Sequence, residues 1–371
     1  MKKKKVLIVI QLVRRGGVEL VAINFAKQLD KNKFDITFLL VNSKDAAQDE
    51  QLLCSLKKDG FKFIEMPTNV TGYLGKYRYL AELMNENKYD IVHSHVMLFS
   101  GIICVAAKKN NVKIRAAHSH TIQWNHNENF KYKVYKFVMQ RLLSKYSTHK
   151  FACSKKAGEF LYGKSTYEKS GIFIANGVDT EKYIYSPETG IEIRNEFGIS
   201  KNDILIGHIG TIYSVKNQVF LVEIIAEMKK INKNIKCIMV GEELERDIVA
   251  EKAKSLDVTE NVIFAGQRND VNKILQAMDI MIFPSLFEAL PVSLIEAQAS
   301  KLPCLISDAV TTEVKFNDNV DFMGLDCSAE QWANRAFDLL DIDRNSITTE
   351  ELAEVYDIHS VCKKLETFYL S

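Results

Sequence analysis

The sequence predicts an α/β fold with two tandem units, each built on a parallel, doubly wound sheet. Apolar runs of strand length alternate along the chain with segments whose apolar residues recur at helical spacing, which is the pattern of successive βαβ units. This alternation runs once from the N-terminus to about residue 175 and begins again near Asp203. The length of 371 residues also exceeds what one hydrophobic core usually holds.

Within the first unit, residues 5–10 (KVLIVI) are continuously apolar, as expected for a strand that is covered on both faces of a parallel sheet. A tight loop at Gly16 and Gly17 follows, and residues 18–29 show helical spacing. Further strands of this unit, separated by helices, are expected at residues 35–41, 61–65, 89–93, 112–117, 148–153 and 172–175.

The second unit begins with a predicted strand at residues 204–210 (ILIGHIG). The stretch from 176 to 202 contains many charges with glycines and a proline, which is typical of a connection between domains. Residues 348–371 are helical by pattern. The remaining elements expected are strands at 235–241, 261–266 and 280–283, and helices from about Lys216, Leu244 and Val271.

The composition is that of a soluble, ordered protein, with 47% hydrophobic residues, 26% charged residues and a formal net charge of +2. So small a charge gives no global argument for nucleic-acid binding, and none is predicted. The seven cysteines are scattered, odd in number and without a C-x-x-C pair, which favours free thiols in a reducing cytoplasm. The longest apolar run, near residues 96–107, is shorter than the ~20 residues that cross a bilayer, and we interpret the lysine-rich N-terminus as the start of a buried strand.

Two carboxylates, Glu288 and Glu296, follow the predicted strand 280–283. Pro291 suits the first position of a helix that continues through residues 292–300, so we expect Glu288 in the loop and Glu296 about one turn into the helix. Both would then lie where open α/β sheets bind ligands, beyond the carboxyl ends of the strands. Glu296 is the only charge in an otherwise apolar helix, so it either faces solvent or is held by hydrogen bonds in a cleft. The spacing alone does not separate a binding pair from a solvated helix face.

Glycines stand after the first strand of each unit, where a ligand can approach the backbone. At Gly16 and Gly17 the N–H groups of the following helix can bind an anion, although a simple tight turn explains these glycines equally. Gly210 ends a strand of the second unit, and Lys216 stands at the start of the next helix, where an ammonium group suits a diphosphate if it is not merely solvated. The sequence contains no G-x-G-x-x-G fingerprint, so a nicotinamide or flavin cofactor is not predicted.

Four histidines end two apolar strands of the first unit: His93, His95, His118 and His120. A metal site is not predicted from them, because no H-E-x-x-H motif or cysteine partner accompanies them. We interpret His118 as a hydrogen-bond donor to a ligand hydroxyl, and His93 and His95 as structural.

Residues 130–146 (FKYKVYKFVMQRLLSKY) are predicted to form one helix with a divided surface. The apolar face consists of Phe130, Val134, Phe137, Val138 and Leu142, and the basic remainder of Lys131, Lys133, Lys136, Arg141 and Lys145. Two interpretations are open: the apolar face packs in the core with the basic face solvated, which we favour, or the helix docks on anionic lipid. Trp124 and His126, in the preceding loop, are candidates for contacts with an acceptor.

Several motifs resemble those of the large family 4 of retaining glycosyltransferases, which have the GT-B fold. They are Gly-Gly-x-Glu at 16–19, FACSKKAGEFL at 151–161, IANGVDTEKY at 174–183, GTIYSVKN at 210–217, NVIFAGQRNDV at 261–271 and FPSLFEALPVSLIEAQASKLPCLISDAV at 283–310. The last is the most specific, and the chain is most similar to the bacterial exopolysaccharide and capsule branch. The resemblance implies two Rossmann-like domains with parallel sheets facing across a cleft: an acceptor-side domain at 1–180, a nucleotide-sugar domain at 181–351, and a C-terminal helix at about 352–371 that packs back on the first domain.

The resemblance also implies roles for the candidate residues. In this family the residue matching Glu288 contacts hydroxyls of the donor sugar, the one matching Glu296 holds the ribose, and the one matching Lys216 binds the diphosphate. His118 matches a strand-end histidine that faces the transferred sugar. The other donor-binding residues implied are Gly16, Gly17, Gly210 and Leu290. The implied donor is a UDP- or GDP-sugar, without metal or cofactor, because positive groups and helix N-termini stabilise the leaving diphosphate.

The expected activity is retaining transfer of a sugar to a saccharide acceptor, lipid-linked in our interpretation, during cell-surface polysaccharide synthesis. The expected location is the cytoplasm, with residues 130–146 touching the inner face of the plasma membrane. The sequence departs from the family pattern at Thr211, Ala289, Lys301 and residues 241–243 (Gly-Glu-Glu for Gly-x-Gly). These departures keep open a catalytically degenerate partner subunit of another transferase, and a sugar-nucleotide epimerase on the same fold is a further alternative.

Overall fold

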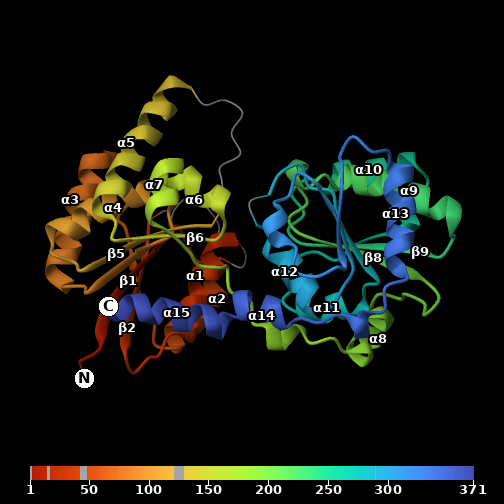
Figure 1. Cartoon of the computed structure of the whole chain (residues 1–371), viewed down its shortest axis with the longest axis horizontal. Coiled ribbons are helices and arrows are strands. Elements are labelled where there is room, and N and C mark those ends of the chain that lie inside the picture. Colours follow the sequence, from red (N-terminus) through yellow and green to blue (C-terminus); the bar gives the residue numbers. More distant parts are fainter. Residues whose placement is uncertain (1, 15–16, 42–47, 121–128, 289) are drawn as a thin grey trace. The chain divides into compact units, whose positions relative to one another are not determined.

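The structure is a computed structural model that describes residues 2–14, 17–41, 48–120, 129–288 and 290–371 (Figure 1). The chain divides into two compact units: unit 1 comprises residues 1–177 and 358–371, and unit 2 comprises residues 178–357. Each unit contains a parallel sheet with helices packed on it, so the predicted α/β class is confirmed.

The sheet of unit 1 has seven strands in the order β3-β2-β1-β4-β5-β6-β7, and every neighbouring pair is parallel. Each strand falls within about two residues of a predicted run. The signal is strongest in central strands such as β1 and β4, which are buried on both faces. The strands are β1 (Lys4–Ile10), β2 (Phe34–Leu40), β3 (Lys62–Glu65), β4 (Ile91–Ser94), β5 (Ile114–Ser119), β6 (His149–Ala152) and β7 (Gly171–Phe173).

Helices cover both faces of this sheet. They are α1 (Gly17–Gln28), α2 (Glu50–Lys58), α3 (Gly72–Asn87), α4 (Ser100–Lys109), α5 (Phe130–Tyr146), α6 (Lys155–Tyr162), α7 (Lys164–Ser170) and α15 (Ile358–Leu370), with a 3₁₀ turn at Met97–Phe99. The central strand β1 shows why its sequence is continuously apolar. Its odd residues, such as Leu7, belong to the core cluster with α3 and α4, and its even residues, such as Ile8, to the cluster with α1 and α2.

Helix α5 contradicts our favoured interpretation of its apolar face. Phe130, Val134, Phe137 and Val138 are 80%, 45%, 58% and 41% exposed, and of the predicted face only Leu142 packs against the core. The side of α5 that packs inward instead consists of Tyr132, Tyr135, Met139, Leu143 and Tyr146. This second set has the same helical spacing, so periodicity alone could not choose between two apolar stripes.

The sheet of unit 2 has six parallel strands in the order β10-β9-β8-β11-β12-β13. The four strands predicted for this unit are present. The edge strand β13 has the sequence VDFM, whose mixed character gives no strand signal by periodicity. The strands are β8 (Ile204–Ile209), β9 (Ile235–Val240), β10 (Val262–Phe264), β11 (Ile280–Phe283), β12 (Cys304–Ser307) and β13 (Val320–Met323).

The helices of unit 2 are α8 (Pro187–Glu196), α9 (Gln218–Ile231), α10 (Arg246–Ser255), α11 (Val271–Ala277), α12 (Val292–Ala299), α13 (Ala329–Leu340) and α14 (Glu350–Tyr356). Short 3₁₀ segments lie at Thr180–Tyr183, Ser214–Lys216, Thr259–Asn261, Thr312–Val314 and Arg344–Ser346. Part of the stretch that we interpreted as a connection is therefore a packed helix. A side chain at Gly190 in α8 would meet the carbonyl oxygen of Gln276 in α11 at 2.5 Å, and Arg194 donates to Asp279.

The helical pattern predicted over residues 348–371 is divided in two. Helix α14 ends at Tyr356 and is followed by Asp357, whose carboxylate accepts from the Thr180 hydroxyl at 2.9 Å within unit 2. Helix α15 belongs to unit 1 and packs on α1. There Glu366 accepts from the backbone N–H of Asp30 and pairs with Lys33 at 2.8 Å.

Gly241, directly after β9, generates a prediction about stability. A Cβ there would lie 2.2 Å from the carbonyl oxygen of Gly210 and 2.5 Å from its carbon, and both are backbone atoms at the end of the neighbouring strand. Gly241→Ala is therefore expected to lower the free energy of unfolding by roughly 1–3 kcal/mol.

The matched control is Gly75→Ala in α3, where nothing lies within 4 Å of the new Cβ and alanine is the better helix former. Urea denaturation followed by far-UV circular dichroism measures both variants. A Gly241→Ala protein as stable as the Gly75→Ala protein would contradict the close packing of the two strand ends.

Candidate functional site

The candidate residues of unit 2 gather at the carboxyl ends of β8 and β11, which are neighbours in the sheet. Gly210 follows β8, Lys216 ends the 3₁₀ turn Ser214–Lys216 just before α9, and Glu288 lies in the loop between β11 and α12. Parallel strands bring these loops to one edge, which is why residues 72 positions apart in sequence come together.

Lys216 and Glu288 form an ion pair, in which the lysine ammonium donates to Oε1 of the carboxylate. The two side chains are only 21% and 17% exposed, so their attraction is less screened than that of a surface pair. The ammonium also lies 4.8 Å from the ring centre of Phe283, the last residue of β11. Gly210 makes this placement possible, because even a Cβ there would stand 3.2 Å from Cε of the lysine.

The two loops that carry this ion pair are tied together by their backbones. The N–H of Leu286 donates to the carbonyl of Val215 at 2.8 Å, and the side-chain amide of Asn217 donates to the carbonyl of Pro284 at 3.1 Å. These two hydrogen bonds hold the loops together beside the ion pair.

A buried histidine, His208, contacts a residue of β11 and the first residue of α9, which follows the Lys216 loop. His208 in β8 contacts the carbonyl of Ile282 through Nδ1 at 3.1 Å and the amide nitrogen of Gln218 through Nε2 at 3.2 Å. Burial lowers the pKa of His208 to about 4, so the ring is neutral, with Nδ1–H donating and Nε2 accepting. The amide of Gln218 also donates to the carbonyl of Thr211 at 2.9 Å, which fixes both ends of the turn. Our sequence analysis did not select His208, although a histidine inside an apolar strand is a usable signal.

Glu296 lies one turn into α12, as predicted, and is held by a partner that we did not predict. The Tyr183 hydroxyl donates to Oε1 of Glu296 at 2.7 Å. Burial raises the pKa of the Glu296 carboxyl, and the hydrogen bond from Tyr183 opposes that shift. Helix α12 begins at Val292, one residue later than expected, because Pro291 is its N-cap residue and not its first helical residue. Leu290, beside Pro291, is buried. Tyr183 belongs to the IANGVDTEKY motif, which was the available signal.

In unit 1, Gly17 opens α1 with φ +60°, a conformation that favours glycine. Two residues on, Glu19 is 3% exposed and pairs with Nε of Arg14 at 3.0 Å. A buried carboxylate thus orients an arginine at the start of this helix, a cation that the sequence analysis did not select. Gly16, Ala289, Trp124 and His126 lie outside the described residues.

His118 lies inside β5 and is 1% exposed, and the residue just beyond the strand end is His120. Nε2 of His118 lies 3.3 Å from the carbonyl of Ile174, and its ring stacks on Phe25 at 5.9 Å. The structure therefore places His118 in the interior of unit 1, among the other histidines of β4 and β5.

Comparison with known proteins identifies the family. Residues 191–353 match the model of glycosyl transferases group 1, and residues 15–182 match that of Glycosyltransferase Family 4. The chain is 31% identical over 314 residues to the glycosyltransferase EpsF of Bacillus subtilis (strain 168). The aligned region covers 84% of this chain and 81% of EpsF. The chain belongs to glycosyltransferase family 4. This confirms the family that the motifs indicated.

Other relatives of this glycosyltransferase have names that state their roles. It is 25% identical over 386 residues, 99% of both chains, to the capsular polysaccharide biosynthesis glycosyltransferase CapH of Staphylococcus aureus. It is 24% identical over 303 residues to the UDP-Gal:alpha-D-GlcNAc-diphosphoundecaprenol alpha-1,3-galactosyltransferase of Escherichia coli, covering 79% of this chain and 76% of that protein. Among solved structures, Anabaena Alr3699/HepE in complex with UDP matches with a TM-score of 0.80 at 18% identity over 98% of both chains. The predicted GT-B fold is confirmed.

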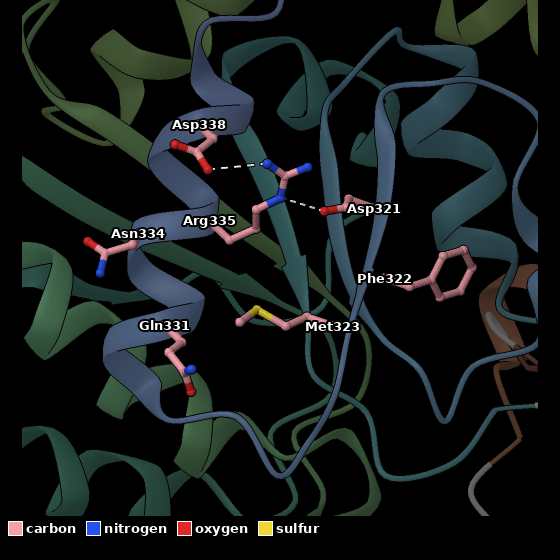
Figure 2. Close-up of a pocket in the computed structure, with 7 residues that line it drawn as sticks. All are labelled: Asp321, Phe322, Met323, Gln331, Asn334, Arg335 and Asp338. Atoms are coloured by element: carbon pink, nitrogen blue, oxygen red, sulfur yellow. Dashed lines mark hydrogen bonds and ion pairs between the residues drawn. The ribbon is translucent and has the colours of Figure 1, made fainter.

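Elsewhere in unit 2, a surface hollow of about 410 Å³ lies between β13 and α13 (Figure 2). Arg335 reaches across it and donates to Asp321 at 2.6 Å and to Asp338 at 3.2 Å. None of the candidate residues of the glycosyltransferase lines this hollow, and the charges in its lining are paired with one another. We therefore assign it no part in the site.

The buried histidines of unit 1 generate a prediction about pH. Burial lowers the pKa of His93 to about 3 and of His120 to about 4, and it holds the pKa values of His95 and His118 well below 6.5. The unfolded chain binds protons below about pH 6.5 while the folded chain does not. The free energy of unfolding is therefore expected to fall as the pH decreases from about 6.5 toward 4, by up to ~1.4 kcal/mol per pH unit for each histidine.

Urea denaturation in a chelating buffer at several pH values measures this slope. His120→Gln should make it shallower by about the contribution of one histidine, whereas substitution of the exposed His359 by Gln should leave it unchanged. A slope that is absent, or that is the same in His120→Gln, would contradict neutral burial of these rings.

Proposed function

We propose that this protein transfers a hexose from a UDP- or GDP-sugar, with retention of configuration, to a lipid-linked saccharide during cell-surface polysaccharide synthesis. The observation that carries the proposal is the Lys216–Glu288 ion pair at the carboxyl ends of β8 and β11, with Glu296 in the following helix. A cation and two carboxylates at this edge suit the two chemical halves of a nucleotide-sugar, its diphosphate and its hydroxyls.

Lys216 binds the diphosphate and neutralises the negative charge that develops when it leaves. In the ligand-free protein its ammonium is held by Glu288, and an arriving diphosphate offers the same charge in the same place. The N-terminus of α9, which begins at Gln218, adds a partial positive charge beside it. We propose that these groups make the transfer step independent of a metal ion.

Glu288 and Glu296 bind hydroxyls. Once the ammonium moves to the diphosphate, both oxygens of Glu288 can accept from hydroxyls of the donor sugar. Glu296 accepts from the ribose, and its hydrogen bond from Tyr183 keeps one oxygen in place for that contact. Of the two acidic residues after β9, Glu243 is engaged elsewhere, because it pairs with Arg246 at 3.3 Å and accepts from the N–H of Gly266.

A lipid-linked acceptor is supported by two observations. One relative is named for transfer to a sugar on diphosphoundecaprenol, and another for capsular polysaccharide biosynthesis. Independently, α5 exposes apolar and basic side chains side by side, as a helix that lies on an anionic membrane does. Within the described ranges, none of the helices combines the length and apolar composition that a bilayer crossing requires.

The membrane-facing surface that we propose extends from α5 to the start of α3. Tyr73 of α3 stacks on Tyr135 of α5 at 5.5 Å, so the two helices join at this point. Tyr73 and Leu74 are 57% and 60% exposed and add to the apolar residues of α5. We propose that this surface holds unit 1 on the inner face of the plasma membrane, where lipid-linked acceptors are found.

The first test concerns Glu288. Glu288→Ala is expected to lower kcat/KM for sugar transfer by roughly 10- to 150-fold or more, because a charge-assisted hydrogen bond is worth about 1.5–3 kcal/mol. Initial rates with a panel of UDP- and GDP-sugars measure the loss. Stabilisation of the fold by the free nucleoside diphosphate should survive in Glu288→Ala and weaken in Lys216→Ala.

Glu260→Ala removes an exposed carboxylate of the same unit and is the control. If no nucleotide or nucleotide-sugar raises the melting temperature of the wild-type protein, the proposed donor site is wrong. If Glu288→Ala transfers sugar as fast as Glu260→Ala, the role of Glu288 is wrong.

The second test concerns the membrane. The double variant Lys131→Glu with Lys133→Glu is expected to abolish flotation with liposomes that contain anionic lipid, because it reverses the charge of an exposed basic surface. Phe130→Ser with Phe137→Ser should weaken binding at high salt, where the apolar contact remains.

The control double variant, Lys201→Glu with Lys233→Glu, makes the same change in net charge at exposed positions of unit 2. Equal flotation of the two charge-reversal variants would overturn docking through α5.

Thr211 favours a second candidate function, a partner subunit that binds nucleotide without transferring sugar. Thr211 stands where members of this family normally have an arginine beside the phosphate-binding lysine. Its backbone carbonyl accepts a hydrogen bond from the side-chain amide of Gln218. Such a subunit would be inactive alone and would raise the activity of a co-expressed transferase. An epimerase would instead yield product from the nucleotide-sugar without any acceptor.

A further inference from the structure

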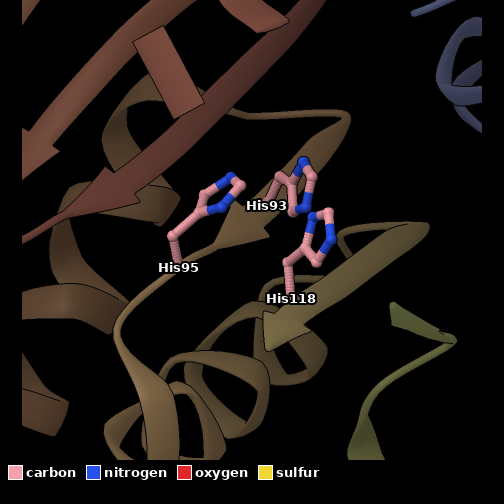
Figure 3. A group of neighbouring side chains, drawn as sticks. All are labelled: His93, His95 and His118. Atoms are coloured by element: carbon pink, nitrogen blue, oxygen red, sulfur yellow. The ribbon is translucent and has the colours of Figure 1, made fainter. Parts of the chain in front are cut away.

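Three histidines of unit 1 converge at the ends of β4 and β5 (Figure 3), and one of them, His118, is the residue that the family resemblance places beside the transferred sugar. His93 and His95 lie two residues apart on β4 and just beyond it, so they share a face of the sheet. The register pairs His93 with Ala116, which brings His118 of β5 beside them. One ring nitrogen of each histidine lies within 4.8 Å of the other two, and the three side chains are at most 4% exposed.

The opposite ring nitrogens are held by partners that decide where the protons are. Nε2 of His118 lies 3.3 Å from the carbonyl of Ile174, which can only accept, so this nitrogen carries the hydrogen and Nδ1 presents a lone pair. Nδ1 of His120 lies 2.6 Å from Oδ1 of Asn176, so it also donates. Nε2 of His120 then accepts from Nδ1 of His95 at 2.7 Å, and Nε2 of His95 presents a second lone pair.

His93 completes the set. Its Nδ1 lies 2.6 Å from the hydroxyl of Tyr369 in α15, a group that can accept or donate. When the phenol oxygen accepts, Nε2 of His93 presents a third lone pair. These three nitrogens, His93 Nε2, His95 Nε2 and His118 Nδ1, are buried and have no hydrogen-bond partner among the described residues. Buried polar atoms without partners are rare, and three in one place call for an explanation.

We propose that His93, His95 and His118 bind one zinc ion or a related divalent transition metal. Three imidazole nitrogens without carboxylate or thiolate suit zinc, copper, nickel or cobalt, and exclude magnesium and calcium, which require oxygen ligands. Metal-bound histidines donate their second ring N–H to a carbonyl or a similar group, and the contacts with Ile174, Tyr369 and the His120–Asn176 pair have that form.

The geometry requires a small closure of the rings. Zinc–nitrogen bonds of about 2.0–2.1 Å in a tetrahedral arrangement place ligand atoms about 3.3 Å apart, whereas one ring nitrogen of each histidine lies within 4.8 Å of the other two. Rotation about the side-chain bonds closes the difference, and a fourth position stays open.

The bound ion would join β4 to β5 and, through Tyr369, would couple occupancy to the packing of α15. The ion would lie in unit 1, apart from Lys216, Glu288 and Glu296, which belong to unit 2. Because the site is buried, the ion enters when unit 1 folds or opens locally.

The test uses the full-length, untagged protein, because an affinity tag of histidines would bind the same metals. The protein is unfolded in chelator, refolded with Zn²⁺ and passed through gel filtration, and zinc per chain is counted by mass spectrometry. One ion per chain is expected for the wild-type protein and for His359→Asn, which changes an exposed histidine. His118→Asn should retain almost none.

Two further measurements keep the test decisive if His118→Asn folds poorly. Asn176→Ala leaves all three ligands in place but removes the contact that fixes the proton of His95, so it should weaken zinc binding roughly 10- to 100-fold. Refolding with Co²⁺ should give the visible bands of a four-coordinate ion with nitrogen ligands. A folded wild-type protein that binds no zinc, cobalt, nickel or copper beyond the level of His118→Asn would overturn the proposal, as would unchanged affinity in Asn176→Ala.

Discussion

The ion pair between Lys216 and Glu288 is the interaction on which the candidate site of unit 2 depends. A partly buried pair of this kind adds little to stability, because the loss of hydration offsets much of the attraction. The pair matters because each of these partly buried charges, without the other, would lack a partner at the edge of the sheet. A diphosphate can take the place of the carboxylate and release Glu288 for hydroxyl groups. The two hydrogen bonds between the loops, one from the Leu286 N–H and one from the Asn217 side chain, keep the cation where that exchange occurs. The neutral ring of His208 contributes through its contacts with Ile282 and Gln218.

Most of this arrangement could be predicted from the sequence because it follows from strand ends. Runs such as KVLIVI are buried on both faces, so their position along the chain is unambiguous, and every strand of unit 1 was predicted near its place. Parallel strands also bring their carboxyl ends to one edge. Residues just beyond those ends, such as Gly210, Lys216 and Glu288, were therefore selected together before their contacts were known.

What could not be predicted depends on contacts that periodicity does not contain. Helix α5 carries two apolar stripes, and only the packing of Tyr132, Tyr135 and Met139 against the core shows which is buried. Tyr183 reaches Glu296 across 113 positions of sequence, a pairing with no local pattern. The break at Asp357 was also hidden, because the sequence on both sides is helical and a turn is imposed there by the bridge between Asp357 and Val178.

Whether a buried histidine is structural or a metal ligand is judged from the partners of both its ring nitrogens. His208 is fully buried and has a partner at each nitrogen, the carbonyl of Ile282 and the amide of Gln218, so nothing further is needed to explain it. In unit 1, His120 is satisfied in the same way. His93, His95 and His118 are equally buried, yet among the described residues each has a partner at one nitrogen only. In this chain, therefore, the structural histidines His208 and His120 have a hydrogen-bond partner at each ring nitrogen. The three histidines that lack one of these partners among the described residues are the three whose rings converge. Buried ring nitrogens normally have hydrogen-bond partners. One cation bound by all three rings is the simplest group that accounts for the three unpartnered nitrogens together.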